Sequence, residues 1–114
     1  MSNIQEIEVS MNELMDCIKK ANMVASLHHN HEFKEIVVDG FFTDYPARLV
    51  RSLADPQIAN NEAKRQQVLR TLEGISAFHD YLNAVHQKGV MATDSLENHK
   101  AELAYEREQA ANSN

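Results

Sequence analysis

The stretch NEAKRQQVLRTLEGISAFHDYLNAVHQKG, residues 61–89, decides the fold class. Its apolar residues recur every three or four positions, which is the spacing of one face of an α-helix. They include Val68, Leu72, Ile75, Leu82 and Val85. Asn60 or Asn61 is expected to cap this helix, and Gly89 is expected to end it, because glycine is common just after a helix. We therefore predict a helix over about 61–88.

The residues before this stretch predict a partner helix over about 31–54. Its apolar residues include Phe33, Ile36, Val37, Phe41, Phe42, Tyr45, Leu49, Val50 and Leu53. Asn30 is a candidate N-cap, and Asp55-Pro56 should stop the helix, because a residue before proline avoids the helical region. Gly40 weakens a helix and Pro46 is tolerated only in a first turn, so we expect a kink or break between them.

Shorter helices are predicted toward the two ends of the chain. The segment Ser10-Met11-Asn12-Glu13 has the pattern of a capping box, which predicts a first helix over about 11–27. A last helix is expected over about 94–108, where the apolar stripe is thin. Gly74, inside the third helix, is expected to permit close approach of a neighbour.

Together these elements predict an all-α fold. The expected architecture is an antiparallel helical hairpin of 31–54 and 61–88 with two flanking shorter helices, which form a small helical bundle. A chain of 114 residues is of the length of one domain, so residues 1–114 are expected to form a single helical domain. Flexible ends are expected at 1–9 and 109–114.

Charge and cysteine content exclude several function classes. The chain has 11 Lys and Arg against 17 Asp and Glu, a net charge of −6, and so lacks the basic surface that nucleic-acid binding needs. No stretch approaches the roughly 20 apolar residues of a membrane span. Cys17 is the single cysteine, which excludes an intramolecular disulfide and a cysteine-based zinc site. The N-terminal residues have no signal-peptide pattern, so a reducing, soluble compartment is expected.

Histidines and carboxylates are the candidates for chemistry. His28, His29 and His31 could form a short metal-binding tract, but their spacing lacks a known zinc pattern, and a solvated turn explains them better. Asp39 and Asp44 flank the expected break, yet nothing in the sequence places them in a pocket that would tune their pKa values. We therefore expect no enzyme activity, no cofactor and no metal.

The segment around Gly40-Phe41-Phe42 is the candidate interaction site. Two adjacent phenylalanines cannot share one helix stripe, so both enter a hairpin core at a break, or one contacts another subunit, as aromatic residues often do. The basic side chains nearby are either solvated or paired with the acidic ends of a neighbouring copy. The candidate interface residues are Phe41, Phe42, Tyr45, Arg48, Arg51, Leu72, Phe78 and Leu82.

Several runs in the middle of the chain resemble a known group of proteins. The runs are Gly40-Phe41-Phe42-Thr43-Asp44-Tyr45, Ala47-Arg48-Leu49-Val50-Arg51, Leu53-Ala54-Asp55-Pro56, Val68-Leu69-Arg70 and Leu72-Glu73-Gly74-Ile75-Ser76-Ala77-Phe78-His79-Asp80-Tyr81-Leu82. Over about residues 31–107 the chain resembles small helical proteins of tailed bacteriophages, encoded in the structural or DNA-packaging gene block and mostly without an assigned activity. These are packing motifs, so the resemblance carries over no catalytic residue.

The resemblance implies a non-enzymatic bacteriophage virion or assembly protein that acts through protein–protein contacts, as a small structural, connector or packaging component. Its expected partners are other phage structural proteins or itself, as a homo-oligomer. Its expected location is the host cytoplasm during assembly, or the virion. An early phage effector that binds and inhibits a host protein, with its acidity mimicking nucleic acid, is the alternative.

Overall fold

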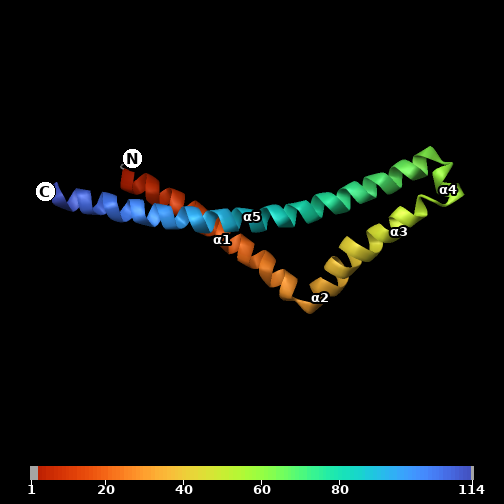
Figure 1. The fold of residues 1–114 in the computed structure, drawn as a ribbon, viewed down its shortest axis with the longest axis horizontal. Coiled ribbons are helices and arrows are strands. Elements are labelled where there is room, and N and C mark those ends of the chain that lie inside the picture. The colour runs from red at the N-terminus through yellow and green to blue at the C-terminus, as the bar shows by residue number, and fades with distance from the viewer. Residues whose placement is uncertain (1–2, 114) are drawn as a thin grey trace. The chain divides into compact units, whose positions relative to one another are not determined.

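The computed structural model describes residues 3–113, and these are almost entirely helical, with no strand among them. The all-α prediction is confirmed. The elements are α1 (Asn3–His29), α2 (His31–Phe33), the π-helix η1 (Lys34–Asp44), α3 (Tyr45–Ser52), α4 (Pro56–Ala59) and α5 (Glu62–Asn112). Figure 1 labels the α-helices, and η1 lies between α2 and α3. None of the helices in this part of the chain combines the length and apolar character needed to cross a bilayer.

The chain forms two compact units, and α5 contributes to both. Unit 1 comprises residues 1–24 and 84–114, and unit 2 comprises residues 25–83. Whether the two units fold together as the single predicted domain stays a prediction.

In unit 1 the first helix packs against the C-terminal half of α5, and the two run in opposite directions. Glu8, near the start of α1, is bridged to Arg107, near the end of α5, at 3.2 Å, while Ala21 lies against Gly89. The buried side chains of this unit are Ile7, Ala21, Val24, Ala92 and Leu103. Most of the molecule's small core therefore lies in unit 1.

The prediction that a helix ends at Gly89 and another starts near 94 is wrong, because α5 runs through both positions as one helix of 51 residues. Gly89 has an ordinary negative φ and not the left-handed conformation of a helix end. The hydroxyl of Thr93 donates to the Gly89 carbonyl at 2.9 Å inside the helix. The buried and half-buried residues keep alternating spacings of three and four across the glycine, so the packed face is uninterrupted. They are Leu82, Val85, Gly89, Ala92, Leu96, His99 and Leu103, with Ser95 half-buried beside Leu96.

The N-terminal helix also begins earlier than predicted. It starts at Asn3, so the capping-box prediction at Ser10 is wrong, and Ser10 lies inside the helix. Ile4 and Ile7 extend the apolar spacing of Met11 and Leu14 backwards by two turns, and Ile7 is only 6% exposed. Burial of this stripe against α5 stabilises a helical turn that the local sequence does not signal.

Of the predicted flexible ends, 1–9 and 109–114, residues 1, 2 and 114 lie outside the described residues. Residues 3–9 belong to α1 and residues 109–112 belong to α5. Flexibility there stays a prediction.

Three helix starts in unit 2 are capped by a side chain, and two of these caps, Asn30 and Asn61, stand at predicted N-cap positions. Asn30 Oδ1 accepts from the Phe33 amide at 2.8 Å, and Asn61 Oδ1 accepts from the Lys64 amide at 3.1 Å, which caps α5. Asp55 Oδ1 accepts from the Gln57 amide at 2.9 Å, and the chain turns there as the Asp-Pro pair predicts. Each oxygen satisfies an amide that has no partner within its own helix.

The break predicted between Gly40 and Pro46 is replaced by a change in helical winding. Residues 34–44 form a π-helix, in which hydrogen bonds join residues five apart, and the chain continues into α3 without interruption. The Tyr45 amide donates to the Gly40 carbonyl. Between them, the Thr43 hydroxyl donates to the Val38 carbonyl at 2.8 Å, five residues back in the same helix. Pro46 lies in the first turn of α3, where its missing amide hydrogen costs little.

Candidate functional site

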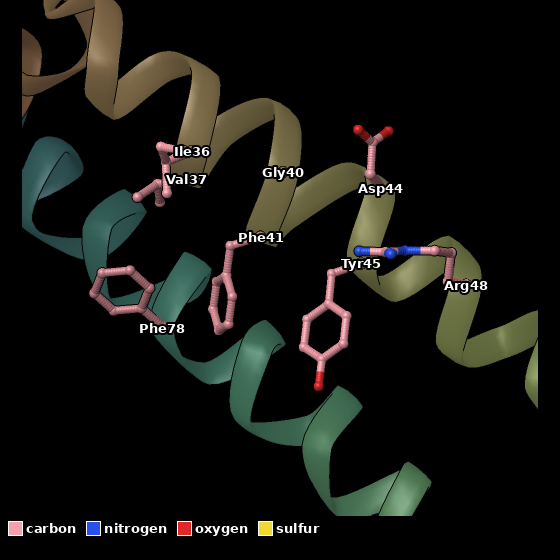
Figure 2. A pocket seen from close by; sticks show the side chains of 8 residues that line it. All are labelled: Ile36, Val37, Gly40, Phe41, Asp44, Tyr45, Arg48 and Phe78. Carbon is pink, nitrogen blue, oxygen red and sulfur yellow. The ribbon is translucent and has the colours of Figure 1, made fainter.

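The candidate site is a groove on unit 2 with a volume of about 580 Å³. One wall is the face of η1 and α3 on which residues recur every four positions, and the other is α5 (Figure 2). The first wall contributes Ile36, Val37, Gly40, Phe41, Asp44, Tyr45 and Arg48, and the second contributes Phe78. The lining is mostly apolar, with one acid and one base.

Aromatic rings form the floor of the groove. The Phe41 ring lies 6.3 Å from the Phe78 ring in an edge-on arrangement and 6.1 Å from the Tyr45 ring, centroid to centroid. Figure 2 shows Phe41 and Tyr45 directed from η1 and α3 toward α5. These spacings lie in the range at which aromatic pairs attract one another. These ring contacts join η1 and α3 to α5 at this point along the groove.

Phe42 lies behind this floor and not in the lining. Its ring contacts Phe78 at 5.5 Å and the His79 ring at 5.0 Å, nearly perpendicular to the latter. The adjacent rings lie 5.8 Å apart and both contact Phe78, but only Phe41 lines the groove, while Phe42 is half-buried against α5. A contact of either ring with another subunit stays a prediction.

The groove presents large apolar side chains to solvent. Ile36 is 70% exposed and Phe78 is 42% exposed, and Phe41 is also exposed. Within unit 2 only two apolar side chains are buried, Ile75 and Leu82. The other apolar side chains of this unit are half-buried or exposed.

The two charged groups stand at the rim. The Arg48 guanidinium lies 6.0 Å from the centre of the Tyr45 ring, whereas the Asp44 carboxylate projects away from α5 (Figure 2). Among the described residues, Asp44 and Arg48 form no ion pair with each other or with another side chain. Both charges are exposed.

The remaining predicted interface residues lie outside the groove. Arg51 is exposed, Leu72 is half-buried and Leu82 is buried in the small core of unit 2. Ile36, Val37, Gly40 and Asp44 line the groove but were not predicted as site residues. The signal that could have found them is a spacing of four: Ile36, Gly40 and Asp44 lead to Arg48, and Val37 leads to Phe41 and Tyr45.

The histidines next to this region make only surface contacts. His31 lies 3.5 Å from the Glu35 carboxylate, and the His28 ring packs edge-on against Phe33. In residues 3–113 no group of three or more His, Cys, Asp or Glu side chains is arranged to hold a metal ion.

A smaller, polar pocket lies in unit 1, where the start of α1 meets α5. Its volume is about 250 Å³, and Glu6, Ser10, His99 and Glu102 contribute its polar side chains. The His99 ring nitrogen Nδ1 is 2.7 Å from the Ser95 carbonyl, so this nitrogen already has a hydrogen-bond partner within α5.

Comparison with known proteins adds no relative. No family model matches the chain, and neither a curated protein nor a solved structure resembles it closely enough to count as a match.

Proposed function

We propose that this protein is a non-enzymatic contact protein that acts by binding other protein chains through the aromatic groove of unit 2. The observation that carries the proposal is the exposure of Ile36, Phe41 and Phe78 in a groove whose walls enclose almost no core. Exposed apolar patches with aromatic centres and a polar rim are typical of protein interaction sites.

In this proposal the two helical segments that line the groove form the predicted antiparallel hairpin of 31–54 and 61–88. The aromatic contacts between η1 and α5 support it, as does the second pocket farther along, which Leu49 and Val68 line together. Aromatic contacts at one point along the hairpin and aliphatic side chains at the next hold its two segments together. A partner therefore meets an ordered surface.

The proposed setting is the assembly of a tailed bacteriophage, with the protein as a small structural, connector or packaging component. This setting follows from the resemblance of residues 31–107 to small phage proteins. Its partners are other phage structural proteins or further copies of the chain, in the host cytoplasm or the virion. A genome context outside any phage would contradict the setting.

A second candidate function is the inhibition of a host protein by nucleic-acid mimicry. It is favoured by the charge of unit 1, where nine acidic residues stand against five basic ones and both acidic ends of the sequence meet. An acidic helical surface of this kind is attracted to basic, nucleic-acid-binding sites.

Mass spectrometry of purified particles and assembly precursors from the encoding phage tests the proposal. The wild-type chain and the variant Val50→Ser, altered on an exposed residue outside the groove, should both be recovered with particles or precursors. The variant Ile36→Ser should be depleted, because it removes an apolar group from the groove. Absence of the wild-type chain from both fractions would contradict the assembly role. Capture of one host protein, with toxicity on expression alone, would favour the inhibitor.

A further inference from the structure

We propose that the groove of unit 2 is occupied by the same groove of a second copy of this chain, in a two-fold symmetric dimer. This inference rests on the proposed function and specifies the partner. In the dimer, Asp44 pairs with the partner's Arg48, and Arg48 pairs with the partner's Asp44.

The first support is the missing core of unit 2. Residues 25–83 bury only Ile75 and Leu82, whereas Ile36, Phe41 and Phe78 stay in contact with solvent. A segment of this size is marginally stable even with a complete core, since about 40% of its surface stays exposed on folding. A partner that covers the groove supplies the apolar burial that the unit lacks.

The second support is the pattern of charge around the groove. A two-fold interface must be self-complementary, because each contact from one subunit is repeated from the other. Asp44 and Arg48 lie one helical turn apart on the rim, carry opposite charges and are not paired with each other. When the helix meets an antiparallel copy of itself, the acid of each subunit faces the base of the other.

The same pairing fixes where the symmetry axis passes. If residue 44 faces residue 48 of the second copy, the axis crosses the helix midway between them, next to Tyr45. Tyr45 is half-buried and stacked beside Phe41, and Arg48 lies over its ring. An aromatic side chain at the centre with charges around it is the usual anatomy of a tight interface. A different partner would need to supply the matching acid and base, which a second copy does by symmetry.

The test uses two charge reversals, Asp44→Arg and Arg48→Asp, measured by sedimentation velocity of the full chain. The wild type is expected to form dimers as concentration rises. Each reversal places two like-charged pairs in the interface and should weaken the dimer by at least about tenfold. An equimolar mixture of the two variants should form a heterodimer, because both of its pairs are then of opposite charge.

The matched controls are Asp39→Arg and Lys34→Asp, which reverse exposed charges on η1 that do not line the groove. Their dimerisation should equal that of the wild type, and circular dichroism should show the same helix content for every variant. If a reversal unfolds the chain, Asp44→Asn and Arg48→Gln take its place, each with an expected severalfold weakening.

A wild type that stays monomeric, reversals that dimerise as the wild type does, or a mixture that fails to form the heterodimer would each overturn the dimer. The proposed function is tested separately from the dimer, by recovery of the chain with phage particles. A monomeric chain that is still recovered with phage particles leaves the contact role intact and removes only the dimer. A two-fold dimer that is absent from particles and precursors removes the assembly role and leaves the dimer.

Discussion

Gly89 of α5 lies directly against Ala21 of α1, with no room for a side chain between them. A Cβ placed on Gly89 would overlap the Cβ of Ala21 and stand 3.3 Å from the Cys17 carbonyl oxygen. Ala21 is buried, and so is Ala92, one turn beyond Gly89. The two helices of unit 1 therefore approach closely at a point where both carry small side chains.

Gly89→Ala should lower the free energy of unfolding by up to about 2 kcal/mol. The added methyl group forces the helices apart, which costs about 1–3 kcal/mol, and the gain of roughly 1 kcal/mol that alanine brings to a helix interior offsets part of this cost. The control is Gly74→Ala, where a Cβ meets nothing within 4 Å and should only stabilise the helix. Urea unfolding followed by circular dichroism measures both. Equal stabilisation by the two substitutions would contradict the close contact.

The closeness at Gly89 also shows where sequence reasoning failed. Gly74 was expected to allow close approach and Gly89 to end a helix, whereas Gly74 faces open space and Gly89 makes the contact. Local rules treat any glycine after a long helix as a stop, although apolar spacing that continues beyond it marks the residue as part of a packed face. Packing against α1, and not the local sequence, determines that the helix continues through Gly89.

Ile7→Ala should cost about 2–4 kcal/mol of stability, because Ile7 is only 6% exposed and its loss leaves a cavity between α1 and α5. The matched control, Val9→Ala, changes a neighbour that is 46% exposed and should shift stability by less than about 0.5 kcal/mol. Thermal and urea unfolding measure the pair. If Ile7→Ala lowers stability no more than Val9→Ala does, the first turns of α1 do not pack against α5 as described.

Asn61→Ala should destabilise α5 by about 1 kcal/mol, because it removes the oxygen that accepts from the Lys64 amide. Asn60→Ala is the control, since the Asn60 side chain makes no hydrogen bond in the described part of the chain. The comparison by urea unfolding separates a specific cap from the general effect of replacing asparagine. The two variants would be equally stable if Asn61 were not the cap.

The caps were predictable because each depends on one polar side chain and the amides next to it in sequence. Asn30, Asp55 and Asn61 all cap where the sequence placed a turn. The all-helical class was predictable from apolar spacing for a similar reason. The register at Gly89 and the early start at Asn3 depend on a distant helix, which local patterns do not encode.

The groove was predictable only in part. Phe41, Tyr45, Arg48 and Phe78 were expected at an interface, and all four line the groove. Ile36 and Val37 were predicted only as apolar residues of the helix, and Gly40 and Asp44 were missed because neither has an apolar side chain that a search for apolar periodicity could detect. The interface role of these residues stays a prediction.

The most direct test that the groove binds a second copy of the chain is the sedimentation of wild type, Ile36→Ser and Val50→Ser, compared from dilute to concentrated solution. Both changed residues are exposed, at 70% and 57%, and lie in the same run of helix, but only Ile36 lines the groove. We expect a wild-type dimer, a dimer weakened roughly tenfold or more by Ile36→Ser because apolar burial is lost, and no change with Val50→Ser. A wild type that is monomeric throughout, or equal weakening by both substitutions, would contradict the dimer through the groove.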